Sequence, residues 1–382
     1  MIDNYEIMLY LDKDKKEILA KVKVNFLSKV YNLRLIINEG LVIDNIIDDK
    51  GNNIIFHEEF NINEIFIESG KRITLEVLDS TNYITIVYSG RISGWHNSIS
   101  DTQIALNYYS AWYPIFVDYD MSIEKKVTIK NIDGFTVIKG KKTEDEWIYR
   151  SSDFDCNIIA VKDWNLISKE SVGLKLNVYF KNSKIEEINY LAESFDRIID
   201  YFTRLLDIEK SINDTFDIVI SKSDKGGYCR KGLIVLCDLP SERINVDAFL
   251  AHECGHIWAT GADVNSWEDW LNETFAEVLS LCFIKKQYGT EGYITRINRI
   301  REIAEKSPQI KSKNGERPDG VHFKGVYLMH ILSEYFGEDK LIEIIKIFVK
   351  SSKKTTENML GEIKEKLGQD IVKFIEYNLT KI

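Results

Sequence analysis

Hydrophobic and polar residues follow two different rhythms along this chain. Up to about residue 181, short runs of β-branched and aromatic residues are separated by Asp, Asn, Gly and Lys, a pattern typical of strands joined by turns. The runs predict strands at residues 5–10, 18–26, 33–37, 54–56, 66–67, 73–77, 83–88, 125–129, 135–139, 146–149, 157–161 and 174–179. This half of the chain therefore favours an all-β, sandwich-like domain.

From residue 183 the apolar positions recur every three or four residues, which indicates helices. A first helix is predicted over residues 185–205, strands at 216–221 and 233–237, and an apolar helix around 246–258. Further helices are predicted at 278–288, 294–307, 323–335, 339–349, 358–367 and 371–379. We therefore predict two domains, an all-β domain over 1–181 and a mostly helical α+β domain over 182–382.

Charge and composition narrow the classes of function. The formal net charge of −10 argues against a surface that binds phosphate, and no basic run indicates a nucleic-acid partner. The first residues lack the basic and apolar regions of a signal peptide, and no apolar run is long enough to span a bilayer. Five cysteines without paired spacing suit a reducing compartment, so we expect a cytoplasmic protein with no membrane partner. The sequence does not indicate an oligomeric state.

The chemistry is concentrated in His252-Glu253-Cys254-Gly255-His256. On a helix, His252 and His256 lie one turn apart and face the same way, so both imidazoles can bind one zinc ion. Glu253 then lies beside the metal and is the natural general base. A chance match within a long helix is the alternative. The apolar flanks argue against it, because unpaired polar groups are costly in a buried helix.

A catalytic zinc ion needs a third protein ligand and an open position for water. Glu273 lies in the next apolar stretch, with sixteen residues between it and His256, and we expect it to be that ligand. Glu277, one turn further on, can accept the free N–H of a zinc-bound histidine and thereby select its tautomer. We therefore expect one zinc ion bound by His252, His256 and Glu273, with Glu277 supporting a histidine.

These motifs carry a resemblance to a known family. His252 to His256, followed by the sequence WLNETFA from residue 270, resembles the HExxH and WLNEGFA signature of the aminopeptidase N-like gluzincins, a family of zinc metallopeptidases. The resemblance implies a saddle-shaped N-terminal β domain, a thermolysin-like catalytic domain and a peptide substrate. The spacer between the two motifs is two residues shorter than is usual in the family. The family's large C-terminal helical domain has no counterpart here, which implies a shortened form.

One departure from the family concerns substrate recognition. The family's GAMEN motif, whose glutamate grips the free α-amine of a peptide, corresponds to GGYCRKGLI from Gly226, with Cys229 in the glutamate's position. Loss of that carboxylate removes a charge-assisted hydrogen bond of about 1.5–3 kcal/mol. Gly226 and Gly227 can let a substrate backbone approach the adjoining strand, although an ordinary tight turn explains them equally well.

The second departure concerns the oxyanion. Family members carry a stabilising tyrosine in a Y-x-K-G stretch, and His322 takes its place in the matching His322-Phe323-Lys324-Gly325. An imidazole can donate a hydrogen bond to a developing oxyanion, and Tyr327 on the following helix is the alternative donor. A partly exposed histidine with no role is the competing interpretation of His322.

The sequence therefore predicts an aminopeptidase-like zinc metallopeptidase. Two alternatives remain: an endopeptidase or propeptide-processing protease without free-amine recognition, and a non-catalytic scaffold that binds zinc and peptides. A cluster of aromatic residues in the β domain, at positions 95, 96, 112 and 113, is interpreted as packing in preference to a substrate surface.

Overall fold

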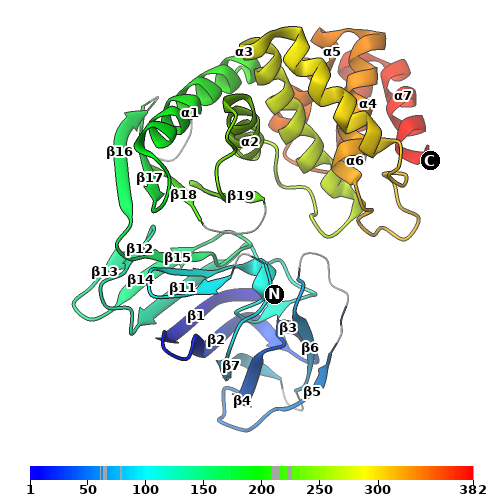
Figure 1. Cartoon of the computed structure of the whole chain (residues 1–382). Helices are drawn as coiled ribbons and strands as arrows, with labels where there is room; N and C mark the ends of the chain where they lie inside the picture. The colour runs from blue at the N-terminus through cyan, green and yellow to red at the C-terminus, as the bar shows by residue number, and fades with distance from the viewer. Residues whose placement is uncertain are drawn as a thin grey trace. The chain divides into compact units, whose positions relative to one another are not determined.

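The computed structural model describes residues 1–60, 62, 67–77, 80–95, 97–171, 173–208, 215–221 and 226–381. The contacts divide the chain into two compact units, Met1–Trp164 and Asn165–Ile382, and each is described by itself. Figure 1 shows that the first unit is built from strands and that helices dominate the second. This arrangement confirms the predicted fold class, an all-β domain followed by a mostly helical α+β domain.

Within the described residues, the first unit contains three β-sheets. Their strand orders are β13-β14-β11-β1-β2-β7-β4, β10-β3-β6-β5 and β12-β15-β9-β8. The strands are β1 (Ile2–Asp12), β2 (Glu17–Val30), β3 (Leu33–Asn38), β4 (Leu41–Ile47), β5 (Ile55–Glu59), β6 (Gly70–Glu76), β7 (Thr81–Gly90), β8 (Ser98–Ile99), β9 (Gln103–Leu106), β10 (Ile115–Phe116), β11 (Glu124–Lys130), β12 (Thr136–Val137), β13 (Lys141–Lys142), β14 (Trp147–Ser151) and β15 (Ile158–Val161). One short 3-10 helix, η1, spans Tyr108–Ser110.

The alternation seen in the sequence explains how these sheets bury one face. In β1, Tyr5, Ile7 and Leu9 are buried, whereas Glu6 and Met8 between them are exposed. Successive side chains of a strand point to opposite faces, so the apolar set of β1 enters the core of the first unit. Of the strand predicted at residues 66–67, Phe66 lies outside the described residues.

The aromatic residues of the first unit serve packing, as predicted for those that the structure describes. Trp112 and Tyr113 are fully buried, and each donates a hydrogen bond to a backbone carbonyl, of Cys156 at 2.9 Å and of Phe154 at 3.0 Å. Trp95 packs edge-on against Tyr109. Residue 96 of this cluster lies outside the described residues.

The first unit also buries a cation. The Lys125 side chain on β11 is fully buried. Its ammonium donates to the carbonyl oxygens of Met121, Ile123 and Asp153, the last two at 3.2 and 2.8 Å. An ammonium has three N–H donors, so this buried charge has a partner for each of them.

The second unit begins with a mixed sheet and continues as helices. Its strands are β16 (Asn165–Ser171), β17 (Leu174–Phe180), β18 (Thr215–Ile220), β19 (Gly227–Arg230) and β20 (Leu233–Leu236), and its helices are α1 (Ile185–Leu206), α2 (Arg243–Gly255), η2 (Trp267–Asp269), α3 (Trp270–Ala304), α4 (Val321–Phe336), α5 (Glu338–Lys350), α6 (Thr356–Leu367) and α7 (Gln369–Thr380). Among the described residues the sheet order is β16-β17-β18-β20-β19, so β19 is an edge strand.

The boundary between the units lies earlier than the predicted 181/182. Trp164 ends the first unit and Asn165 begins the second, because β17 pairs in parallel with β18. β16 pairs with β17 as a hairpin and therefore belongs to the same sheet. A parallel pair requires a crossover connection, and α1 lies between the two parallel strands in the chain. The change of period at residue 183 marks the start of α1 and not the start of the second unit.

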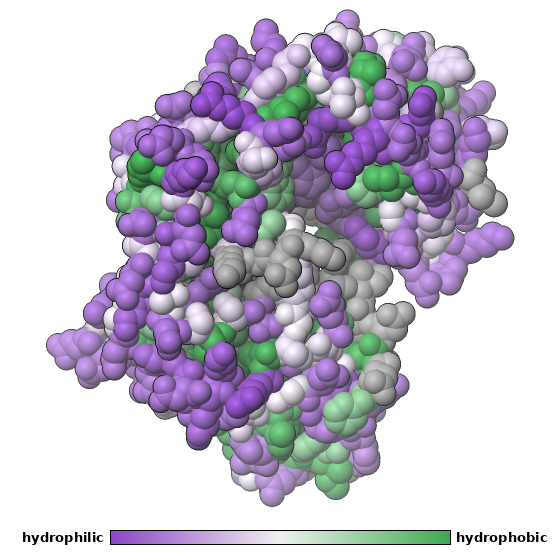
Figure 2. Space-filling view, viewed as in Figure 1, coloured by the Kyte–Doolittle hydropathy of each residue, from purple (hydrophilic) through white to green (hydrophobic). Residues whose placement is uncertain are grey.

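The two helices predicted at 278–288 and 294–307 belong to one element. α3 runs from Trp270 to Ala304 with a break at Gly289, where φ is +78°. None of the helices in the described part of the chain combines the length and apolar character needed to cross a membrane. Hydrophilic side chains cover most of the visible surface of each unit in Figure 2, and hydrophobic ones form small separate patches.

Candidate metal centre

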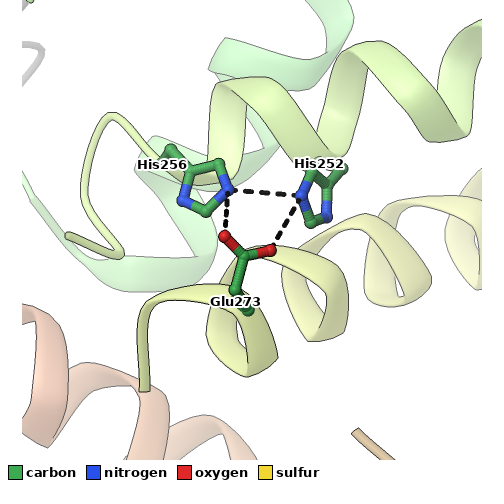
Figure 3. Close-up of side chains that lie close together, drawn as sticks. All are labelled: His252, His256 and Glu273. Carbon is green, nitrogen blue, oxygen red and sulfur yellow. Dashed lines mark hydrogen bonds and ion pairs between the residues drawn. The ribbon is translucent and has the colours of Figure 1, made fainter. Parts of the chain in front are cut away.

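α2 supplies the first two side chains of the candidate site. His252 lies in its last turn, and His256 follows its final residue with backbone angles that still belong to the right-handed helical region. The two imidazoles therefore keep the one-turn relation expected from the sequence. Glycine at position 255 allows the next step, because a Cβ there would lie 2.8 Å from the Cα of Ala276 on α3. The close approach of α2 to α3 brings Glu273 beneath the two histidines (Figure 3).

Three side chains converge at this point. The Nε2 atoms of His252 and His256 are 3.2 Å apart, and the Glu273 carboxylate oxygens lie 3.6 Å from the first and 3.8 Å from the second. In a tetrahedral zinc site with bonds of about 2.0–2.2 Å, neighbouring donor atoms lie about 3.3–3.6 Å apart. Two imidazole nitrogens and a carboxylate are also a donor set that zinc prefers. The geometry and the chemistry of these three residues therefore fit a zinc ion.

The other ring nitrogens strengthen this fit. Nδ1 of His252 lies 2.9 Å from the Glu277 carboxylate, and Nδ1 of His256 lies 3.2 Å from the carbonyl oxygen of Ala259. Carboxylate and carbonyl oxygens accept hydrogen bonds, so in each neutral ring the hydrogen is on Nδ1 and Nε2 carries a lone pair. Two lone pairs at 3.2 Å repel each other unless a proton or a metal ion lies between them.

The pKa values of His252 and His256 indicate that, near neutral pH, the pair carries one positive charge. Burial by itself lowers the pKa of His252, but the hydrogen bond to Glu277 and the nearby carboxylates outweigh it and raise the pKa to about 9. Burial lowers the pKa of His256 to about 4, with the charge of His252 adding to the effect. Without a metal, a single proton on His252 would therefore bridge the two Nε2 atoms.

Glu253 is close to the triad but is not part of it. Its side chain is buried in α2, and burial raises its pKa to about 7, despite the opposing charges of His252 and Arg230. A carboxyl group whose pKa lies near neutrality can both accept and donate a proton. Arg230 on β19 was not identified from the sequence. In the sequence GGYCRKG, Arg230 resembles a residue of a turn. Only the fold places its charge near Glu253.

α4 brings His322 to the site. Its Nδ1 lies 3.8 Å from a Glu273 oxygen, and its ring centre is 6.1 Å from that of His252. Gly325 makes this possible, because a Cβ there would lie only 1.9 Å from Oγ1 of Thr274 on α3. Tyr327 packs against His330, with ring centres 6.1 Å apart, and no contact joins it to the triad among the described residues. Of the two predicted oxyanion donors, the structure therefore places His322, and not Tyr327, beside the three converging side chains.

A pocket of about 540 Å³ opens beside these residues. It is lined by Gly226, Gly227, Pro240, Asn245, Ala248, Phe249, His252, Glu253, Glu277, Arg296, Arg299 and His322. The predicted substrate-binding glycines thus line the same pocket as the predicted base. Gly226 has φ of +74°, and a Cβ on Gly227 would meet the Phe249 ring at 2.8 Å, so local geometry by itself requires glycine at both positions.

Comparisons with known proteins agree with the motif. No protein-family model matches the chain. The chain is 22% identical over 431 residues to the probable aminopeptidase 1 of Sulfurisphaera tokodaii. The alignment covers all of this chain and 53% of the relative. It is 24% identical over 319 residues to the probable M1 family aminopeptidase 1 of Encephalitozoon cuniculi, covering 69% of this chain and 36% of the relative. The chain therefore spans about half or less of the length of these curated relatives.

Solved structures show the same fold. The native leukotriene A4 hydrolase of Saccharomyces cerevisiae matches with a TM-score of 0.69 and 15% identity, over 98% of this chain and 67% of that one. The yeast enzyme in complex with bestatin matches with a TM-score of 0.71 over 100% of this chain and 67% of that one. The similarity to M1 family aminopeptidases seen in the motifs is thus borne out by curated relatives, and the fold by these structures.

Proposed function

We propose that this chain, similar in sequence to M1 family aminopeptidases and folded like leukotriene A4 hydrolase, is a zinc-dependent metallopeptidase. The observation that carries the proposal is the convergence of His252, His256 and Glu273 with a buried carboxyl group, Glu253, beside them. A structural metal site has no need of a fourth, protonatable group at this place. A site for hydrolysis does need one.

In this proposal, His252, His256 and Glu273 hold one zinc ion. When bound, zinc would supply a Lewis acid that lowers the pKa of a water molecule and polarises the peptide carbonyl. Glu253 takes the proton of the attacking water on its carboxylate and then donates it to the leaving amine. Burial raises the pKa of Glu253 and so favours its protonated form, which helps it to hold the proton between the two transfers.

Two further side chains assist. Glu277 accepts the Nδ1–H of His252 at 2.9 Å and so turns Nε2 toward the other donors. His322 lines the pocket and donates a hydrogen bond to the oxyanion of the tetrahedral intermediate. Burial lowers the pKa of His322, so a neutral imidazole fills this role near neutral pH.

The peptide binds along the edge of the sheet. β19 is the edge strand of the five-stranded sheet within the described residues, and the pocket includes Gly227 at its first position. An extended peptide can add to such an edge by backbone hydrogen bonds, which hold the scissile bond without regard to side chains.

The position of Cys229 favours a second candidate, an endopeptidase or processing protease. Cys229 lies on β19, where the family's amine-binding glutamate is expected, and its thiol provides no carboxylate for an ammonium group. Glu253 speaks against a non-catalytic scaffold, since binding alone does not require a base.

Matched peptides with free and acetylated N-termini test the proposal. We expect hydrolysis of both at similar rates, and no hydrolysis by the metal-free protein. Cys229→Glu is expected to favour the free amine by about tenfold to a hundredfold, because it restores a charge-assisted hydrogen bond. If the wild-type protein strongly prefers the peptide with a free amine, it is an aminopeptidase that recognises the amine without a glutamate at position 229. Failure to cleave any peptide of a broad library with zinc bound would overturn the peptidase proposal.

A further inference from the structure

The pocket beside Glu253 contains two arginines that the reaction itself does not use. Arg296 and Arg299 lie on α3, beyond the break at Gly289, and both line the pocket with His252 and Glu253. Residues three apart on a helix share a face, so the two guanidinium groups lie on the same side of α3.

The positive charge of Arg296 has only distant polar partners. One terminal nitrogen lies 3.4 Å from the side-chain oxygen of Asn245, and the other lies 4.0 Å from a Glu277 oxygen. Both distances are longer than an ordinary hydrogen bond. The other Glu277 oxygen already accepts from His252, and Nε of Arg296 is buried without a partner in the described part of the chain. Arg296 therefore has N–H donors that are available to a ligand.

Arg299 is exposed on the same wall and makes no ion pair with any described residue. Arg317 shows the contrast, because its Nε lies 2.7 Å from the Asp269 carboxylate. Arg301, on the same helix as Arg299, lies outside the pocket. The chain as a whole carries a net charge of −10, so two arginines without strong partners in one pocket are a local exception.

We infer that this pocket binds a carboxylate of the peptide, held by Arg296 and Arg299 beside the scissile bond. The inference rests on the proposed function, because it names the substrate class of the same site: peptides with an acidic residue or a free C-terminus close to the bond that is cleaved. A guanidinium presents parallel N–H donors that match the two oxygens of a carboxylate, and a charged acceptor strengthens each hydrogen bond. Two arginines three residues apart can share one such group.

Binding to the zinc-loaded Glu253→Gln variant tests the inference without turnover. Three peptides of one sequence are compared: one with Glu near the cleavage position and an amidated C-terminus, its Gln counterpart, and the Gln peptide with a free C-terminus. We expect one of the two carboxylate peptides to bind about tenfold or more tightly than the neutral one. The peptide that gains affinity identifies the source of the carboxylate.

Variants then separate the arginines from other causes. Arg299→Met and the double variant Arg296→Met/Arg299→Met should lose most of the difference, whereas the control Arg301→Met should keep it. Arg299→Met is informative by itself, because Arg299 does not contact Glu277 and the metal content should stay unchanged. A difference that persists in the double variant would come from a carboxylate bound directly to zinc and would overturn the inference. Equal binding of all three peptides to the parent protein would overturn it as well.

Turnover by the wild-type chain distinguishes the peptidase proposal from the inference that the pocket binds a carboxylate. Cleavage of acidic and neutral peptides with equal kcat/KM leaves the peptidase proposal standing and refutes the inference. A protein that binds the carboxylate peptides through Arg296 and Arg299 but cleaves none supports the inference and refutes the peptidase proposal.

Discussion

The two units of this protein each bury a cluster of charged or polar groups, and the clusters differ in how their hydrogen bonds are satisfied. In the first unit, the Lys125 ammonium meets three backbone carbonyls, one for each of its donors. In the second, the Nε2 atoms of His252 and His256 face each other at 3.2 Å above the Glu273 carboxylate. The first cluster is complete without a ligand. In the second, the lone pairs converge on one point, which a proton or a metal ion can occupy.

This difference distinguishes a cluster that stabilises the fold from one that can bind a ligand. A buried charge with all its partners stabilises one arrangement of the chain and offers nothing to a ligand. Buried groups whose lone pairs converge are costly by themselves and become favourable when a metal binds. Removing a member of each cluster should therefore affect different properties of the protein, stability in one case and metal binding in the other.

The largest effect is expected from His256→Ala. A site of three protein ligands cannot lose one without a large fall in affinity, so this variant should lose its zinc and all hydrolysis. Elemental analysis after dialysis against a weak chelator measures the metal. One zinc per chain is expected for the wild type, and full zinc retention in the variant would refute the assignment of His256.

Glu253→Gln should separate metal binding from catalysis. The amide has the shape of the carboxylate but cannot accept the proton of water, so hydrolysis should fall by about 10²–10⁴-fold. Zinc content should remain that of the wild type, because Glu253 is outside the group of converging donors. Wild-type turnover in this variant would mean that a different base operates.

Lys125→Met should affect stability alone. It leaves the three carbonyls without their donor, and we expect the free energy of unfolding to fall by about 1–3 kcal/mol. Urea denaturation measures the change, and zinc content per folded chain should not change. Lys126→Met, on the opposite face of the same strand, is the matched control and should differ little from the wild type. A loss of zinc in Lys125→Met would contradict the separation of the two clusters.

The smallest effect concerns pH. Burial lowers the pKa of Lys125 below its ordinary value of 10.5. Between the two values the unfolded chain binds more protons than the folded one, so the stabilising contribution rises with pH, is complete above 10.5, and is lost as pH falls through the lowered pKa. The difference in unfolding free energy between wild type and Lys125→Met should therefore grow as pH approaches 10.5. A difference that is constant or shrinks over this range would show that the pKa is not lowered.

The sequence by itself determined those features that depend on neighbours along the chain. The change from a period of two to a period near four separated strands from helices, because side-chain direction within an element is a local property. The same reason made His252, Glu253 and His256 recognisable, since one helix sets their relation. Glu273 and Glu277 followed from the second motif, and their closeness to the histidines is what the structure adds.

Only the tertiary structure decided what depends on partners distant in the chain. β17 has the strand pattern of the first unit, yet it belongs to the second, because strand pairing is a contact between separate segments. Gly255 and Gly325 are unremarkable in the sequence, and the packing of α2 and α4 against α3 gives them their role. Arg296 and Arg299 likewise carry no motif. Their place beside the candidate metal centre comes from the fold alone. Burial and hydrogen bonding are set by what surrounds a side chain, whereas a sequence pattern reports only what lies next to it along the chain.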